Sequence, residues 1–512
     1  MTHELPVWLI SRREFLQGLA AAGVLAGLAP GAVAEAMTRE LRFGGLPIDE
    51  KLIRRLLTRA MSRGGEFAEV YVQDVLTDSV RLDESKIRSA TVGAMRGVGV
   101  RVIKGIKVGY AYSDDFSPAA LERTADTAAL IASGAGSWTP HPLEPRMAKP
   151  QSPIRVNSSE TPVSKKVAML MAINDTARSY DARVKQVTAA FEDATSYRLV
   201  ANTEGLLIED RDVMARLAAY VIAADAHDRR TGFYGGGGRV GFEHYETFTP
   251  VDVAKRAAQI AVATLGAVDA PAGEQTVVLA NGWSGILLHE AIGHGLEADF
   301  IRKGTSLYTG KVGQKVAGEQ CTVIDDATLP NKRGTFNMDD EGSAPQRKVL
   351  IDRGVLRGYM SDRLNAKLLD PAAHSTGNGR RESFRHMPIP RMSNTFLAPG
   401  TATPEDIIKS VKKGLYAKMF GGGQVDIANG NFVFEVAEGY LIEDGRVTKP
   451  VKGAMLIGVG PVALQNVSLV GADAALDPGI GTCGKDGQGV PVGVGLPHVR
   501  IDKITVGGTR TA

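Results

Sequence analysis

The composition of the chain is that of a soluble globular protein. It has 512 residues, of which 44% are hydrophobic and 23% are charged. Lys and Arg number 60 against 57 Asp and Glu, and the resulting net charge of +3 gives no electrostatic footprint for nucleic acid or an anionic membrane surface. The length suggests about two to four domains. Two cysteines are too few for a disulfide scaffold.

The amino terminus has the layout of an export signal. Arg12 and Arg13 precede Phe-Leu and an Ala/Gly-rich apolar stretch that ends in Ala-Val-Ala at 32–34. This order predicts a twin-arginine signal peptide over residues 1–34 and a periplasmic location. The apolar stretch is too short and too weakly apolar for a stable membrane span. The alternative, an amphipathic helix, is disfavoured by Pro30 and the repeated glycines.

Two α+β domains are expected after the leader, the first over 35–145 and the second over 146–268. A proline-rich connection separates them, and a run of four glycines at 235–238 is expected to be flexible. The elements predicted from periodicity, caps and breakers are an amphipathic helix at 48–61, a β-hairpin at 97–113, a helix at 118–132, and an Ala-rich helix that Thr249 caps and Pro250 opens.

The third segment, 269–512, is rich in short β runs separated by Gly and Pro. This pattern predicts a largely antiparallel β domain that carries a short, distorted metal-binding helix. Two Gly-rich stretches, 377–381 and 421–426, are expected to be loops on which a site could be built. The predicted fold class is therefore α+β, with the β-rich domain last.

The most informative segment of this domain is GWSGILLHEAIGHGLEADF, where His289, Glu290 and His294 follow an apolar run. Two imidazoles with an adjacent carboxylate are how a helix holds zinc beside a general base. The spacing is one residue longer than H-E-x-x-H, and residues i and i+5 lie about 140° apart on a regular helix. One metal can meet both rings only if the turn widens, and Gly293 is where a π-bulge or a break could widen it. The alternative is two core or helix-end histidines beside a solvated glutamate.

A zinc site needs a third protein ligand, and two residues are candidates. Cys483 lies in PGIGTCGKDGQGVPVGVGLP, which is too rich in glycine for a good helix or strand interior. A thiol on such a loop can approach a metal closely and deprotonate. Glu297 is the alternative ligand, unless it is an exposed helical carboxylate. The pattern around Cys321 indicates a small buried residue. The alternative is a Cys321–Cys483 disulfide, which would remove the thiol ligand.

The motifs also occur in a recognisable order: HEAIGHGLEADF, GNGRRESFRHMPIPRMSNT, FGGGQVDIANGNFVFEVAEGYLIEDG, KPVKGAMLIG and GTCGKDGQGVPVGVGLP, with FAEVYVQD and VGVRVIKGIKVGYAYSDD nearer the amino terminus. This order resembles the TldD branch of the TldD/PmbA family of metallopeptidases over nearly everything after the leader. The resemblance implies one zinc per chain, bound by His289, His294 and Cys483, with Glu290 as general base. It also implies an extended or unfolded peptide substrate and a dimer, including a heterodimer with a PmbA (TldE) paralogue. Typical members look cytoplasmic, which is the alternative to export.

The sequence thus predicts a zinc-dependent metallopeptidase that hydrolyses short or unfolded peptides. Arg380, Arg381 and His386 are candidate substrate-binding groups for an oxyanion or a carboxylate, although paired arginines are often solvated or structural. One alternative is a zinc amidase acting on a non-peptide amide. Another is a chain that holds zinc without catalysis, as a subunit of a hetero-oligomer. Glu290 favours catalysis, because a structural site needs ligands but no base.

Overall fold

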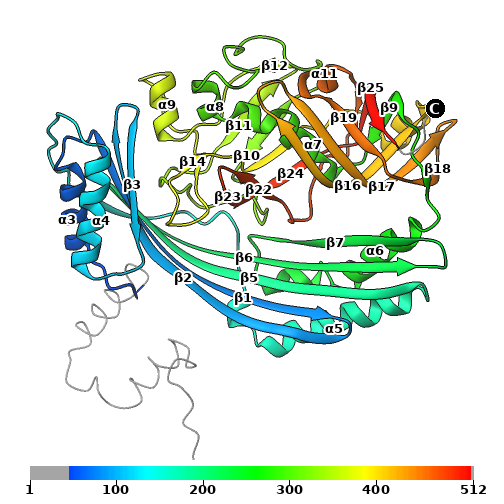
Figure 1. Ribbon diagram of the computed structural model, residues 1–512, viewed down its shortest axis with the longest axis horizontal. Helices are drawn as coiled ribbons and strands as arrows, with labels where there is room; N and C mark the ends of the chain where they lie inside the picture. Colours follow the sequence, from blue (N-terminus) through cyan, green and yellow to red (C-terminus); the bar gives the residue numbers. More distant parts are fainter. Residues whose placement is uncertain (1–44, 509–512) are drawn as a thin grey trace, which may run out of the picture. The chain divides into compact units, whose positions relative to one another are not determined.

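A seven-stranded sheet forms the centre of the amino-terminal half (Figure 1). The computed structural model describes residues 45–508, so the predicted signal peptide lies outside the described residues. The strand order is β3-β2-β1-β5-β6-β4, with β7 paired to β6, and all pairs are antiparallel except β4–β6. The strands are β1 (Phe67–Asp83), β2 (Lys86–Lys104), β3 (Lys107–Ser113), β4 (Glu144–Met147), β5 (Val184–Asn202), β6 (Leu206–Ala224) and β7 (Arg229–Gly238).

Helices accompany this sheet at the positions expected from the sequence. The helices predicted at 48–61, 118–132 and from Pro250 onward are confirmed, as is the β2–β3 hairpin. Thr249 caps α6 by accepting a hydrogen bond from the backbone N–H of Asp252. The helices are α3 (Glu50–Met61), α4 (Pro118–Ile131), α5 (Val163–Tyr180) and α6 (Pro250–Ala263).

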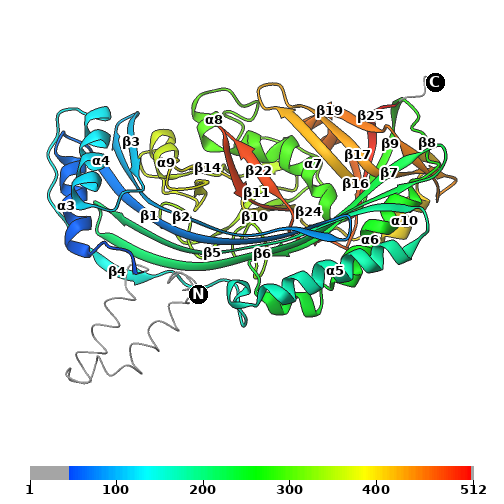
Figure 2. The same ribbon diagram turned by 60° about the horizontal axis from the view of Figure 1, so that its bottom comes forward.

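The two faces of the sheet have different partners because side chains alternate along each strand. One face packs against α5 and α6 through an apolar cluster that includes Phe191, Leu217 and Ala257. The other face turns toward the carboxy-terminal half (Figure 2). There, Tyr71 packs with Phe384. The sheet takes strands from both segments expected as separate domains, 35–145 and 146–268, and these segments therefore share one sheet.

The run of four glycines at 235–238, which was expected to be flexible, lies in a strand. It forms the buried end of β7, and the backbone of Pro478 and Gly479 packs directly on it. A Cβ atom at Gly236 would lie 2.6 Å from the carbonyl oxygen of Pro478. Only glycine permits this approach, so the run serves close packing.

The carboxy-terminal half is a largely antiparallel β structure, as predicted, and the fold class is α+β. One sheet of eight strands follows the order β16-β9-β25-β19-β17-β18-β8 with β20 beside β25, and a second of six follows β12-β11-β10-β15-β24-β21. The strands are β8 (Val268–Asp269), β9 (Gly273–Leu279), β10 (Val323–Asp326), β11 (Arg347–Asp352), β12 (Val355–Leu356), β13 (Gly379–Arg380), β14 (Ile389–Pro390), β15 (Asn394–Leu397), β16 (Lys413–Asp426), β17 (Asn431–Glu443), β18 (Arg446–Lys452), β19 (Met455–Val459), β20 (Val467–Val470), β21 (Ala475–Leu476), β22 (Thr482–Lys485), β23 (Gln488–Pro491), β24 (Gly493–Leu496) and β25 (Val499–Gly507).

The helices of this half are short. They are α7 (Ile286–Leu288), α8 (Ala298–Arg302), α9 (Arg363–Leu369), α10 (Pro404–Lys409) and α11 (Gly460–Gln465). The Gly-rich stretch 421–426 was expected to be a loop but is the end of β16, paired with β17. The core of this half contains the apolar residues of the histidine segment, so that segment is buried by its own sequence. No described helix is long and apolar enough to cross a membrane.

Candidate metal centre

The histidine segment forms the widened turn that its spacing requires. Helix α7 runs directly into one π turn, His289–Gly293, and then a 3-10 turn, His294–Leu296. The backbone N–H of His294 donates to the carbonyl of His289, five residues earlier. The extra residue brings the centroids of the two imidazole rings to within 5.0 Å of each other, and the ring planes meet at 87°. A regular helix would have turned the rings apart.

Close packing holds this irregular turn in place. A Cβ atom at Gly293 would lie 2.0 Å from the sulfur of Met392, so no side chain fits at the point where the turn widens. The hydroxyl of Tyr308 donates to the carbonyl of Ala291 at 3.2 Å, which satisfies a group that the π turn leaves free. The apolar neighbours Leu288 and Ile292 are buried in the core. The turn is therefore fixed from both sides.

Cys483 lies on a β-hairpin, not in an irregular loop. Strands β22 and β23 pair through Cys483 and Val490, and the two-residue turn is Asp486-Gly487. Both turn residues have positive φ, 49° and 71°, as a type I′ turn requires. The dipeptide Asp-Gly is a strong hairpin signal, so this element was visible in the sequence beneath the abundance of glycine.

The hairpin brings the thiol to the two imidazoles. The Nε2 atom of His289 is 3.2 Å from Sγ of Cys483, and the Nε2 atom of His294 is 3.3 Å from the same sulfur. The three donor atoms lie within 4.8 Å of one another, and all three residues are buried. Tetrahedral zinc with ordinary Zn–N and Zn–S bonds separates such donors by about 3.6 Å. The donor set therefore fits zinc in both chemistry and spacing.

Glu297 orients a histidine and is not one of the three clustered donors. Its Oε2 atom is 3.0 Å from Nδ1 of His294 and 3.0 Å from Nζ of Lys485. Its side chain is fully buried, which corrects the alternative of an exposed helical carboxylate. Burial raises its pKa, but Lys485 and His294 outweigh burial and lower the pKa to about 2. An ionised Glu297 keeps a proton on Nδ1 of His294 and leaves Nε2 free to face the thiol.

The electrostatics of the three donors favour a thiolate. Burial raises the pKa of Cys483, but the nearby His289 and His294 outweigh burial and hold it well below the usual value. Burial lowers the pKa of His294, but Glu297 and the thiolate raise it well above the usual value. The thiol proton thus belongs on the imidazole side, and a metal that binds here has to displace it.

Glu290 is the most accessible group of the motif. Its side chain is 17% exposed, and its Oε2 atom is 3.9 Å from Nε2 of His294. The carboxylate therefore lies beside the donor cluster without belonging to it. That is the placement of a general base.

The second cysteine takes no part in this site. Cys321 is buried, its thiol is 3.6 Å from the carbonyl of Leu464, and burial raises its pKa to about 12. Both cysteines are unpaired in the structure, and the thiol of Cys483 faces the two imidazoles. The disulfide alternative finds no support in this arrangement.

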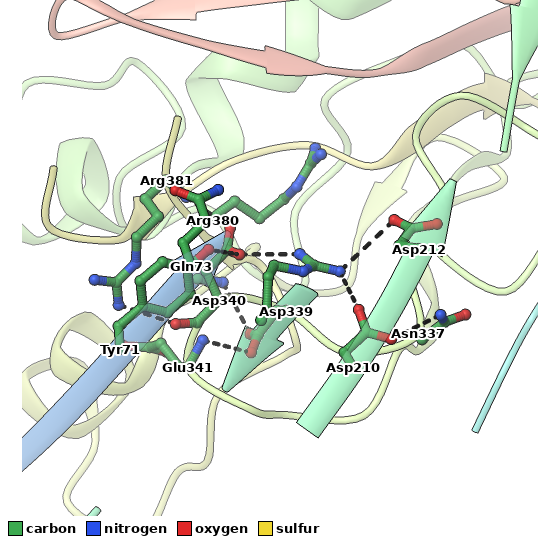
Figure 3. A network of polar contacts seen from close by, with 12 residues as sticks. Tyr71, Gln73, Asp210, Asp212, Asn337, Asp339, Asp340, Glu341, Arg380 and Arg381 are labelled. Carbon is green, nitrogen blue, oxygen red and sulfur yellow. Dashed lines mark hydrogen bonds and ion pairs between the residues drawn. The ribbon is translucent and has the colours of Figure 1, made fainter. Parts of the chain in front are cut away.

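The candidate substrate-binding residues separate in space. The guanidinium of Arg381 stacks on Tyr71 (Figure 3). It donates to Glu69 on the first sheet at 2.6 Å. Arg380 donates instead to the backbone carbonyls of Met392 and Pro491, at 2.6 and 2.7 Å. The Nδ1 atom of His386 is 3.1 Å from the hydroxyl of Ser383. Of these three candidates, only Arg380 donates to the hairpin, and Arg381 points toward the first sheet instead.

Two further arginines contact the hairpin, and spacing along the chain gave no sign of either. Buried Arg391 donates to the carbonyls of Cys483 and Gln488, at 2.5 and 3.1 Å. Arg333 donates to the carbonyl of Gly481 at 2.7 Å. These contacts join residues 92 and 148 positions apart, so only the folded chain shows them.

Comparison with known proteins gives the same picture over most of the described chain. Models of the PmbA/TldA metallopeptidase family match in three parts: domain 1 at 68–132, the central domain at 157–265 and the C-terminal domain at 272–508. A metalloprotease TldD homolog of Haemophilus influenzae is 44% identical over 87% of this chain and 94% of its own.

Two other relatives add detail. A zinc metalloprotease TldD homolog of Saccharolobus solfataricus is 34% identical over 46% of this chain and 52% of its own. The crystal structure of TldE from Thermococcus kodakarensis is 22% identical and shares the fold, with a TM-score of 0.73 over 89% of this chain and all of that one. With family models on all three parts and a relative this similar, the chain belongs to the PmbA/TldD family and is a metallopeptidase of the TldD type.

Proposed function

We propose that this chain is a zinc-dependent peptidase that hydrolyses short or unfolded peptides. The observation that carries the proposal is the π turn, which brings both histidines of H-E-x-x-x-H to a single thiol. His289, His294 and Cys483 would hold one zinc per chain. The name of the Saccharolobus solfataricus relative supports zinc as the metal.

The catalytic chemistry divides between the metal and Glu290. When bound, zinc supplies Lewis acidity, which polarises a scissile carbonyl and makes water more acidic. Glu290 takes a proton from the attacking water at its partly exposed carboxylate and passes it to the leaving amine. Glu297 holds the Nδ1 proton of His294 and so keeps the ring in one orientation.

The burial of the donors supports an unfolded substrate. The exposed fractions of His289, His294 and Cys483 are 1%, 8% and 3%. The surface of a folded protein cannot reach donors so deep, whereas an extended peptide can. A dimer with a TldE-like paralogue is proposed as the working assembly, since TldE has the same fold.

Zinc content and peptide cleavage, measured on the same protein, test the proposal. The wild type and Glu290→Gln are each expected to bind about one zinc per chain, and only the wild type to cleave an unstructured peptide mixture. Non-peptide amides in the same panel distinguish an amidase. If wild type with zinc cleaves nothing, alone or with the paralogue added, the peptidase function is wrong.

Export by the twin-arginine route is proposed as well. Its support is the sequence of residues 1–34, with paired arginines before an Ala/Gly-rich stretch. Joined to a reporter protein, these residues should carry the reporter to the periplasm, and Arg12→Lys with Arg13→Lys should stop it. A reporter that stays in the cytoplasm with the native leader would exclude this route.

A further inference from the structure

A cavity of about 580 Å³ lies between the pair β6–β7 and the pair β16–β17. Two of its lining residues belong to segments that lead to metal ligands. Trp283 is in the 3-10 turn Gly282–Gly285 that runs into α7 and His289, and Ile480 lies three residues before Cys483. The cavity therefore borders both arms of the metal centre, and its volume is in the range of ligand sites.

Positive charge dominates the lining of this cavity. Its charged residues are Arg216, Arg229, Arg230, Lys452 and a single carboxylate, Glu435. Arg230 has its own partner, since Nε is 3.0 Å from Asp228. Arg216 has none: within residues 45–508 its side chain makes no hydrogen bond or ion pair, and its Nε atom is buried without a partner. Such an unmatched buried donor is costly unless something binds to it.

A second arginine, Arg333, reaches the same face of β6: its Nη1 atom is 3.2 Å from the sulfur of Met214, two residues before Arg216 in the strand. Arg333 donates to the carbonyl of Gly481 at 2.7 Å and to the hydroxyl of Thr482 at 3.3 Å. Arg216 is paired across β6–β7 with Gly237, on which the backbone of Gly479 packs. Arg216 and Ile480 line the same cavity, and Arg333 donates to the next two residues, so both arginines lie near the segment just before the thiol ligand.

Two acidic residues that act on Arg333, Asp477 and Glu192, do not neutralise this pair. Asp477 accepts backbone N–H bonds from Gly479, Ile480 and Val494, which occupy its carboxylate. Glu192 lies opposite Arg216 across β5–β6 but is exposed, and the described structure contains no ion pair between them within 4.0 Å.

The proximity of the two cations has an electrostatic consequence. Burial lowers the pKa of Arg333, the positive charge of Arg216 lowers it further, and the resulting pKa is about 10. Two adjacent cations without a bound anion are destabilising, and a carboxylate between them would remove the repulsion. A guanidinium binds a carboxylate through two parallel hydrogen bonds, which makes arginine the suited residue for that ligand.

We propose that Arg216 and Arg333 form a carboxylate-binding subsite of the peptidase, on the assumption that the proposed function holds. The ligand is a carboxylate of the peptide, either its free carboxy terminus or an Asp or Glu side chain. The aromatic wall beside Arg216, formed by Tyr220, Phe233 and Trp283, takes an apolar neighbour of that carboxylate. Substrates that lack a carboxylate near the cleaved bond are bound more weakly.

Binding to the zinc-loaded Glu290→Gln protein separates recognition from cleavage. The probes are fluorescent peptides of one neutral sequence, with a free or an amidated carboxy terminus, and the same pair with one internal Glu or Gln. The protein should bind at least one carboxylate peptide about 10- to 100-fold more tightly than its neutral match, as expected for charge-assisted hydrogen bonds. The arm that shows the preference identifies the source of the carboxylate.

Substitutions in the same background assign the preference to residues. Arg216→Gln should reduce the preference for the carboxylate peptides about 10-fold or more and leave binding of the neutral peptides unchanged. Arg333→Gln should also reduce the preference, and because Arg333 supports the hairpin as well, its zinc content is measured alongside. Arg216→Lys should retain part of the preference, since a lysine keeps the positive charge but cannot form the two parallel hydrogen bonds of a guanidinium. Arg353→Gln, a surface arginine with a 75% exposed side chain, is the matched control and should retain all of it.

The outcomes distinguish this subsite from the peptidase function itself. If wild type cleaves all four peptides equally and both Gln variants bind them as before, the peptidase stands and the subsite is wrong. If nothing is cleaved but binding depends on a carboxylate and on Arg216, the subsite stands without the peptidase. Binding that is absent or indifferent to carboxylates overturns the subsite.

Discussion

Two regions meet at the metal centre and are held there in different ways. The histidine turn, 286–296, is apolar and sits in the core of the carboxy-terminal half. The hairpin that carries Cys483, 481–491, has four glycines among its residues and contributes few side chains to packing. Arginines from distant parts of the chain donate to its carbonyl groups instead. One region is placed by its own sequence and the other by its neighbours.

This difference tells which substitutions matter in each region. In the turn, any added volume disturbs packing, because the backbone approaches Met392 and Tyr308 without room for a side chain. The residues that hold the hairpin in place belong to other segments of the chain, and Arg391 is the first of them to test. The sharpest tests change one region while the other is left intact.

Removing the thiol should have the largest effect. Cys483→Ser keeps the shape of the hairpin but removes the soft ligand, so zinc affinity should fall by more than about 100-fold, the upper range for groups that only support ligands. Competition with a chelator measures the change. Cys321→Ser, at the other buried cysteine, should leave the affinity of the folded protein unchanged. Equal affinities for wild type and Cys483→Ser would exclude the hairpin from the site.

Removing the support of the hairpin should have the next largest effect. Arg391→Met leaves the carbonyls of Cys483 and Gln488 without their donor, and zinc affinity should fall about 10- to 100-fold. Arg381→Met is the matched control, because this equally buried arginine contacts Glu69 and not the hairpin. The control should lower stability and leave the zinc affinity of the folded protein unchanged. The same loss of affinity in both variants would mean that Arg391 has no specific role.

Filling the space at Gly293 tests the turn alone. Gly293→Ala should lower the free energy of unfolding by about 1–3 kcal/mol, because the new methyl group overlaps the sulfur of Met392. Adding Met392→Ala should recover part of the loss in the Gly293→Ala background. Denaturant unfolding of wild type, Gly293→Ala, Met392→Ala and the double variant measures both values. If Gly293→Ala is as stable as wild type, or if the double variant recovers none of the loss, the turn is not packed as described.

The proton on His294 gives the smallest but most specific effect. Its raised pKa means that zinc binding near neutral pH releases a proton from this imidazole. Glu297→Gln removes a cause of the raised pKa, so fewer protons should be released and zinc affinity should fall about 10-fold. Calorimetry in buffers of different ionisation heat counts the protons. An unchanged count in the variant would contradict the role given to Glu297.

Glu297 also gives a prediction for how stability depends on pH, with a definite sign. Because the pKa of Glu297 is lowered in the folded state to about 2, its ionised form stabilises the fold above the ordinary glutamate pKa. This contribution is lost as the pH falls from about 4.5 toward 2. The difference in unfolding free energy between wild type and Glu297→Gln should therefore be constant near neutral pH and shrink on acidification. A difference that grows with acid would reverse the assignment.

The two regions also differ in how far the sequence predicts them. The spacing of His289 and His294, with Gly293 between them, was enough to predict a widened turn, either a π-bulge or a break, because helix geometry alone demands it. The structure shows that it is a π turn. Cys483 was a candidate from composition, but its strand was missed although Asp-Gly marked the turn. Arg391 and Lys485 could not be found, since nothing local distinguishes an arginine that caps a carbonyl 92 residues away. Tertiary contacts place the hairpin, and a single sequence does not contain them.

The most direct measurement is the absorption spectrum of the protein loaded with cobalt in place of zinc. If His289, His294 and Cys483 bind the metal together, the spectrum shows intense tetrahedral bands and a thiolate charge-transfer band, and Cys483→Ser removes the latter. A spectrum without thiolate character, the same in wild type and variant, would contradict a metal centre made by joining the turn to the hairpin.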